Sequence, residues 1–96
     1  MPEYIRVVTF EADEAALDAM VKEISTAPGP PEGVNATRIS VLADRAAGKA
    51  VISVRFPSED DLKKGAAVFE AMEPPSGGSI KRLTVDAYEI VLERDA

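Results

Sequence analysis

The residues of this chain best suited to chemistry are two arginines in the stretch "TRISVLADRAAGKAVISVRF", residues 37–56. Arg38 and Arg55 stand near its two ends, and a guanidinium can hold a carboxylate or a phenolate through two parallel hydrogen bonds. Side by side, two such charges repel each other unless an anion lies between them. Together with nearby polar residues of the same pattern, the candidate ligand-binding set is Arg38, Arg55, Ser40, Ser53, Tyr88 and Arg6.

Two kinds of group can neutralise these arginines. The internal candidates are Asp86 and Glu89, from the same chain or from a second copy. The external candidate is a small acidic or aromatic ligand, to which Tyr88 can donate a hydrogen bond, although a tyrosine on a strand also suits an interface between copies. Both alternatives stay open at this point, and no residue is assigned a catalytic role.

The composition excludes several other chemistries. The 96 residues contain no cysteine and no histidine, which removes thiolate metal ligands, the usual haem ligand and the commonest general base. We therefore expect no haem, zinc or flavin. A net charge of −6 repels phosphate backbones, so we expect no nucleic-acid partner.

No apolar run approaches the ~18 residues of a membrane span, and the acidic start is unlike a signal peptide. We expect a cytoplasmic protein with no membrane partner.

The stretch that holds the arginines predicts a β-hairpin. Asp44 would face Lys49 across a short turn in which Gly48 takes a positive φ. One face of the hairpin is then continuously apolar, and the hydrophobic pattern disfavours a register one residue away. The apolar pairs are Ala43 with Ala50, Val41 with Ile52, and Ile39 with Val54. The other face places Arg38 opposite Arg55, Ser40 opposite Ser53, and Leu42 opposite Val51.

Two amphipathic helices flank this hairpin. Asp13 can cap the first, which should end before Pro28, and Ser58 can cap the second, which should end at the loop "EPPSGGS". The apolar stripes expected to face the core are Leu17, Met20, Val21 and Ile24 in the first helix, and Leu62, Ala66, Phe69 and Met72 in the second. Residues 27–35, "APGPPEGVN", should form a surface loop.

Two further strands are expected at the ends of the chain. Residues 4–10 are rich in β-branched and aromatic side chains, and residues 80–93 alternate between apolar and polar. In the second segment the apolar residues change parity near Glu89. Either a β-bulge at that point or a strand that continues onto a partner subunit would explain the change.

The order strand, helix, strand, strand, helix, strand predicts an α+β fold of the ferredoxin-like βαββαβ type in a single domain, residues 1–96. It contains a four-stranded antiparallel sheet with both helices on one face. We expect the other face to carry Arg38, Ser40, Leu42, Val51, Ser53 and Arg55, joined by Tyr4, Arg6, Val8 and Phe10. That face is too apolar to remain fully exposed to solvent, which predicts a homodimer with the sheets face to face.

The succession "PGPPEGVNATRISVLADRAAGKAVISVRFPSEDDLKKGAAVFEAM", with the closing "VDAYEIV", resembles the dimeric αβ-barrel superfamily. It is most similar to an uncharacterised branch related to the antibiotic biosynthesis monooxygenases. The resemblance implies a homodimer whose sheets enclose a barrel. Such families include cofactor-free monooxygenases, haem-degrading enzymes that hold iron through a histidine, and members with no known activity.

The leading hypothesis is a non-catalytic barrel that binds a small acidic or aromatic ligand. The alternatives are a cofactor-free monooxygenase acting on an aromatic substrate and a pure assembly module, so whether the chain is an enzyme stays open. A pocket of ~300 Å³ or more would argue against the assembly module.

Overall fold

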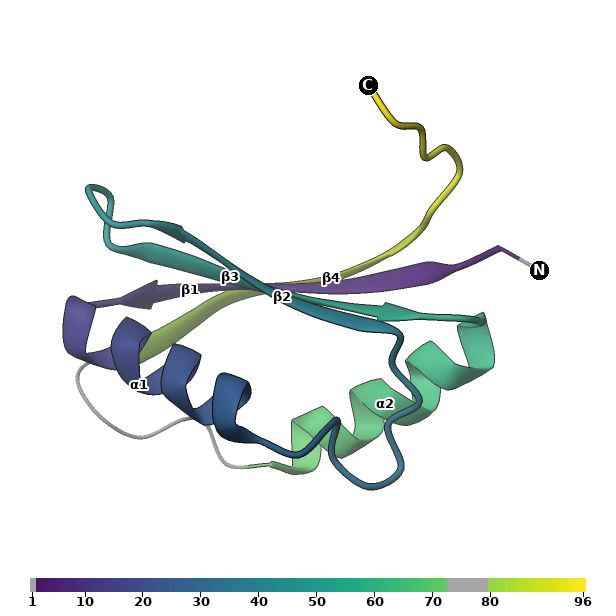
Figure 1. Ribbon diagram of the computed structural model, residues 1–96, viewed down its shortest axis with the longest axis horizontal. Helices are drawn as coiled ribbons and strands as arrows, with labels where there is room; N and C mark the ends of the chain where they lie inside the picture. Colours follow the sequence, from purple (N-terminus) through teal and green to yellow (C-terminus); the bar gives the residue numbers. More distant parts are fainter. Residues whose placement is uncertain (1, 73–79) are drawn as a thin grey trace.

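The computed structural model describes residues 2–72 and 80–96 and has the element order expected of a ferredoxin-like α+β fold. The elements are β1 (Tyr4–Ala12), α1 (Glu14–Thr26), β2 (Arg38–Asp44), β3 (Lys49–Phe56), α2 (Glu59–Ala71) and β4 (Ile80–Glu89). The strands form one antiparallel sheet in the order β2-β3-β1-β4. Both helices lie on one face of it (Figure 1). We call the face without helices the open face.

The β2–β3 hairpin has the predicted register. Arg38 pairs with Arg55, and the ladder runs without interruption to Asp44 opposite Lys49. Gly48 in the turn has a φ of 68°, a conformation that costs glycine little because it lacks a Cβ. The alternation of apolar and polar residues, together with a glycine that determines the position of the turn, was therefore enough to predict the register of this hairpin.

Both helices begin at the predicted caps. The Asp13 carboxylate accepts a hydrogen bond from the Ala16 amide at 2.8 Å, and the Ser58 hydroxyl accepts one from the Asp61 amide at 3.2 Å. Each cap satisfies an amide that has no partner within the helix. α1 ends at Thr26, before Pro28 as predicted, while the predicted loop "EPPSGGS" at 73–79 lies outside the described residues.

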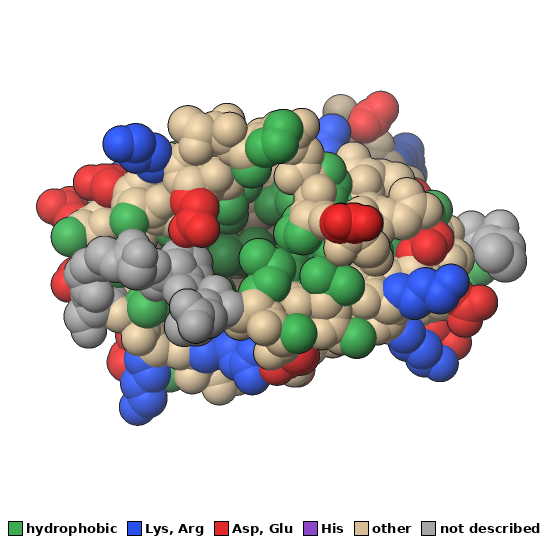
Figure 2. Space-filling model, turned by 90° about the horizontal axis from the view of Figure 1, so that it is seen from below, with side chains coloured by type: hydrophobic (Ala, Val, Ile, Leu, Met, Phe, Trp, Pro, Cys, Tyr) green, Lys and Arg blue, Asp and Glu red, His purple; other side chains and the backbone are tan. Residues whose placement is uncertain are grey.

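The core lies between the sheet and the two helices. Phe56 and Met20 are completely buried there, and hydrophobic side chains line the gap between the helices on that side (Figure 2). Gly65 of α2 is buried against Phe56, and a Cβ at this position would stand 2.4 Å from the ring. The predicted stripes are correct except at their margins, because Val21 and Met72 remain 43% and 48% exposed.

Strand β4 departs from the prediction in length and in the position of its irregularity. It ends at Glu89 instead of residue 93. Its pairing with β1 shifts between Thr9, which faces Thr84, and Phe10, which faces Arg82. Leu83 is therefore the extra residue of a β-bulge. Of the two explanations offered for the parity change near Glu89, a bulge at that point is wrong, and a strand that continues onto a partner subunit stays a prediction. The parity change near Glu89 marks the end of the strand.

No helix within the described ranges is long and apolar enough to cross a membrane.

Candidate binding face on the open side of the sheet

The strand register sorts the side chains of the open face into successive rows that cross all the strands. Residues directly paired in neighbouring strands point to the same face. From one end of the strands to the other, the rows are Arg38, Arg55, Ile5 and Tyr88; Ser40, Ser53, Val7 and Asp86; Leu42, Val51, Thr9 and Thr84; and Asp44, Lys49, Glu11 and Lys81. We call the first the arginine row and the last the charged row. Neither α1 nor α2 covers any of them (Figure 1).

The structure brings together most of the predicted binding residues. Arg38, Arg55, Ser40 and Ser53 form two adjacent pairs on β2 and β3. Tyr88 lies in the arginine row on the outer strand β4, separated from Arg55 by Ile5, and is 55% exposed.

Arg6 lies on the other face, so its assignment to the open face is wrong. It pairs with Val54 in β3, whose side chain belongs to the core. Tyr4, Val8 and Phe10 share the parity of Arg6 and also face the helices, contrary to the prediction. The residues of β1 on the open face are instead Ile5, Val7, Thr9 and Glu11.

The chain tolerates Arg6 in the core because its charge is neutralised there. The Arg6 guanidinium donates a hydrogen bond to the Glu70 carboxylate of α2 at 2.8 Å and lies 5.3 Å above the centre of the Phe69 ring. Arg82 of β4 reaches the same carboxylate oxygen, also at 2.8 Å. The hydrogen bond from Arg82, followed by that from Arg6, lowers the pKa of Glu70.

Arg55 is neutralised within the chain, but by carboxylates other than those predicted. Its guanidinium donates to Glu3 at 2.8 Å and forms a close ion pair with Glu93. Within the chain neither Asp86 nor Glu89 forms this contact, so their prediction as internal partners is wrong, and their approach from a second copy stays a prediction.

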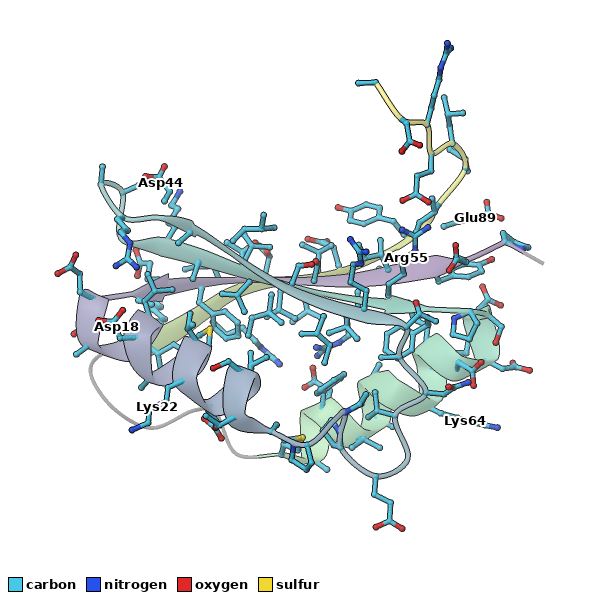
Figure 3. The ribbon with its side chains drawn as sticks, viewed as in Figure 1. Asp18, Lys22, Asp44, Arg55, Lys64 and Glu89 are labelled. Atoms are coloured by element: carbon cyan, nitrogen blue, oxygen red, sulfur yellow. The ribbon has the colours of Figure 1, made fainter. Side chains whose placement is uncertain are left out.

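The electrostatic consequences of this arrangement are mutual. Glu93, and after it Glu3, raise the pKa of the Arg55 guanidinium, and Arg55 lowers the pKa of the Glu93 carboxyl. Figure 3 shows Arg55 on the side of the sheet away from the helices, beneath the C-terminal segment. The Arg55 side chain is only 19% exposed, and its Nε is buried without a hydrogen-bond partner among the described residues.

Arg38 differs from its neighbour. It is exposed, and within residues 2–72 and 80–96 it forms no ion pair. Its charge contributes to the lowered pKa of Glu93, after the larger effect of Arg55. Of the two arginines that the sequence singled out, Arg38 is the one whose guanidinium stays open to another group.

The chain beyond β4 rises from the sheet on the open side (Figure 1). The Ile90 amide donates a hydrogen bond to the Glu3 carbonyl at 2.8 Å, and the ion pair of Glu93 with Arg55 holds the segment further along. Between these two attachments Val91 and Leu92 are 84% and 82% exposed. Two adjacent aliphatic side chains are thus held in solvent by polar contacts on either side.

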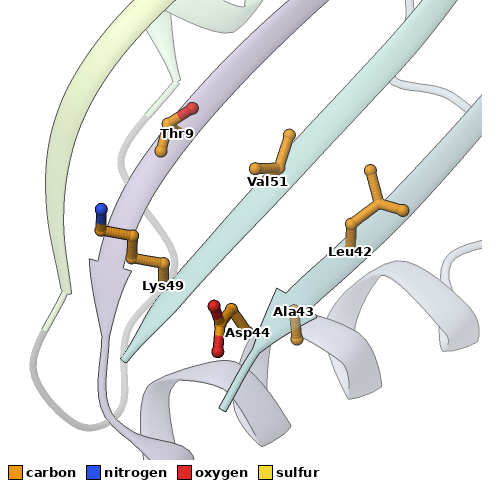
Figure 4. A pocket seen from close by; sticks show the side chains of 6 residues that line it. All are labelled: Thr9, Leu42, Ala43, Asp44, Lys49 and Val51. Atoms are coloured by element: carbon orange, nitrogen blue, oxygen red, sulfur yellow. The ribbon is translucent and has the colours of Figure 1, made fainter. Parts of the chain in front are cut away.

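A hollow lies toward the charged row of the open face. Its volume is about 280 Å³, and its lining residues are Thr9, Leu42, Ala43, Asp44, Lys49 and Val51. Thr9, Leu42 and Val51 project on the same side of the sheet (Figure 4). A second hollow, of about 370 Å³, lies at the edge beside Glu11, Ala12, Asp13, Ala47, Gly48 and Lys81. Both are open to solvent.

The sequence analysis missed three carboxylates that hold the arginines. Glu3 carried a signal, because it shares the parity of Ile5, which pairs directly with Arg55. Glu93 lies beyond the last strand, where no periodicity applies, and Glu70 lies on a helix whose rotation over the sheet the sequence does not specify. Among the described residues, no carboxylates gather in a group able to hold a metal ion.

No known family model, curated protein or solved structure matches this chain.

Proposed function

We propose that this chain is a non-catalytic binding protein of the dimeric αβ-barrel kind. Two copies bring their open faces together and enclose a small, largely apolar ligand that carries an aromatic ring or an acidic group. The observation that carries the proposal is the open face itself, which presents a hollow lined in part by Leu42 and Val51 and is covered by neither α1 nor α2 (Figure 1).

The distribution of exposed apolar side chains supports the assembly. Leu42 and Tyr88 are each 55% exposed on the open face, and Val91 and Leu92 stand beside it. A sheet with helices on one face only is usually covered on the other when that face is apolar. A dimer of this kind should bury more than ~1,200 Å² in total, the lower end for specific complexes.

The size and lining of the hollow support a ligand. About 280 Å³ in one copy falls just below the ~300 Å³ at which ligand pockets begin, and two facing copies would enclose more. Leu42 and Val51 suit a flat apolar group, while the hydroxyls of Thr9, Ser40 and Ser53 offer hydrogen bonds. Lys49 is the cation in the lining itself. Arg38, which has no ion pair among the described residues, lies at the other end of β2 and would meet the acidic group of a ligand that extends along the open face.

One observation favours the pure assembly module as a second candidate. The two terminal nitrogens of Arg55 are paired with Glu3 and Glu93, so half of the predicted anion site already has internal partners. In that case the open face would meet a second copy and enclose no ligand.

The assembly is tested by analytical ultracentrifugation at about micromolar concentration. We expect a dimer for the natural chain and a monomer for Leu42→Glu. The matched control is Val21→Glu, which places the same charge on a comparably exposed aliphatic position of α1 and should leave the dimer intact. A monomeric natural chain would overturn the proposal.

Ligand binding is tested by thermal shift with flat aromatic carboxylates and their neutral amides. We expect the natural chain to be stabilised by the acids, and Arg38→Gln to lose the response to the acids alone. A dimer that responds to no compound would favour the assembly module. Oxygen uptake with polyphenols would replace the binding proposal with that of a cofactor-free monooxygenase.

A further inference from the structure

The charged row at one end of the open face has alternating signs. Asp44, Lys49, Glu11 and Lys81 follow one another across β2, β3, β1 and β4 through direct cross-strand pairs. All of them are exposed. Within residues 2–72 and 80–96, none of them forms an ion pair. A second copy that presents the same four charges in the opposite order would place a charge of opposite sign against each of them.

A two-fold axis parallel to the strands would place this row against its own reverse. Such an axis turns one sheet over onto the other, so that β2 faces β4 of the second copy while the strand ends stay aligned. Asp44 then lies opposite the partner's Lys81, and Lys49 lies opposite the partner's Glu11. Because an interface of this symmetry uses the same patch twice, each attractive pair occurs twice.

The other way to stack the two faces is less favourable. A two-fold axis across the strands would bring the charged row over the arginine row of the second copy. Asp44 would then face the partner's Arg38, and Lys81 would face the partner's Tyr88. Lys49, however, would face the partner's Arg55, which Glu3 and Glu93 already neutralise, and Glu11 would face the partner's Ile5. This arrangement therefore has one kind of opposite-charge pair where the first has two, and it sets a carboxylate against an aliphatic side chain, which weakens an interface.

The first arrangement also suits the opposite end of the face. It places Arg38 opposite the partner's Tyr88, and when no ligand lies between them a guanidinium over a tyrosine ring is an attractive contact. In the next row, Ser40 faces the partner's Asp86, whose carboxylate can accept a hydrogen bond from the serine hydroxyl.

We propose that two copies dock through their open faces about a two-fold axis parallel to the strands, with the charged row setting the alignment. The proposal rests on the proposed dimer and adds its geometry. The second copy is the occupant that fits because its surface carries the complementary charges at the same spacing.

The test uses two charge reversals that must cooperate between chains. Asp44→Lys and Lys81→Glu each create repeated like-charge contacts in their own dimer, which should weaken it about tenfold or more. In an equimolar mixture, a heterodimer of the two variants has opposite charges at every one of these positions. We therefore expect the mixture to dimerise as tightly as the natural chain in ultracentrifugation.

Rescue within one chain is ruled out by the topology. Asp44 and Lys81 lie on the two outer strands, separated by β3 and β1, a distance of about 14 Å at the usual strand spacing. The matched controls are Glu23→Lys on α1 and Lys64→Glu on α2, two exposed positions on the helices. Neither control should weaken the dimer, and mixing them should change nothing.

A second measurement covers the case in which a charge variant fails to fold. The chain has no cysteine, so Asp44→Cys mixed with Lys81→Cys can be joined only across the interface by a short bis-maleimide. We expect this pair to cross-link and the pair Asp44→Cys with Arg38→Cys not to. The reverse pattern, or single variants that dimerise normally, would overturn the axis, whereas a monomeric natural chain would overturn the dimer itself.

Discussion

The two faces of the sheet each hold an arginine on an inner strand, but they neutralise it with different parts of the chain. On the helix face Arg6 is buried against Phe69 and held by Glu70 of α2. On the open face Arg55 is held by Glu3 and Glu93, which precede the first strand and follow the last. The helix face is therefore completed by the regular elements of one chain, whereas the open face relies on terminal segments and, in our proposal, on a second copy.

The largest difference between the faces should appear when an apolar side chain is removed from each. Phe56→Ala deletes a completely buried ring and should lower the free energy of unfolding by about 3–5 kcal/mol. Leu42→Ala, at a 55% exposed position of the open face, should change it by about 0.5 kcal/mol or less. Urea unfolding at a concentration low enough to keep the chain monomeric measures both. Equal losses would show that the open face is also covered within one chain.

A smaller effect should separate the two arginines that share Glu70. Arg6 and Arg82 donate to the same oxygen at the same distance of 2.8 Å, but their side chains are 8% and 49% exposed. Arg6→Gln should destabilise the fold by about 1–3 kcal/mol, because it loses a buried charged hydrogen bond and the contact with Phe69. Arg82→Gln should cost less than about 1 kcal/mol, as exposed ion pairs do. Thermal unfolding of the two variants would sharpen the comparison, and a larger loss for Arg82→Gln would contradict it.

The smallest expected effect is on the stability of the fold at low pH. The pKa values of Glu70 and Glu93 are lowered from an ordinary 4.5 by their arginines, chiefly Arg82 and Arg55. Because the folded chain binds these protons less readily than the unfolded chain, both ion pairs stabilise the fold above about pH 4.5 and lose that contribution as the pH falls through the lowered values.

Unfolding measured from pH 6 to pH 3 should therefore show a decline that is shallower in Glu70→Gln and in Glu93→Gln than in the natural chain. The control is Glu32→Gln, an exposed carboxylate in the loop between α1 and β2. It should follow the natural curve, and a curve for Glu93→Gln that also matched it would show that the pair with Arg55 does not persist in solution.

The success of the sequence analysis depended on how clearly each segment alternates. In the β2–β3 hairpin the apolar residues occupy one parity and Gly48 fixes the turn, so the register was predicted pair by pair. In β1 both parities are apolar, since Val8 and Phe10 share one and Ile5 and Val7 the other. The choice between them depended on Arg6, and its burial with Glu70 involves a helix more than sixty residues away in the chain.

The partners of the arginines were harder to predict than the arginines themselves. Local pattern placed Arg38 and Arg55 side by side, because neighbouring strands impose that relation. Glu93 reaches Arg55 from a segment with no regular structure, so no periodicity could indicate it. A contact between a strand and a chain end depends on how the whole chain folds. The sequence shows that both residues of such a pair are present, but not that they meet.

The bulge in β4 also makes the strand one residue longer than its ladder requires. Thr84 and Arg82 oppose consecutive residues of β1, so Leu83 lies between two positions that would be neighbours in a regular strand. A chain from which Leu83 is deleted could keep every other pairing of β4, with Arg82 still directed at Glu70 and Lys81 still on the open face. Strand β4 should therefore tolerate the deletion of one residue at Leu83. The deletion should leave the side chains of the strand on the same faces of the sheet as before.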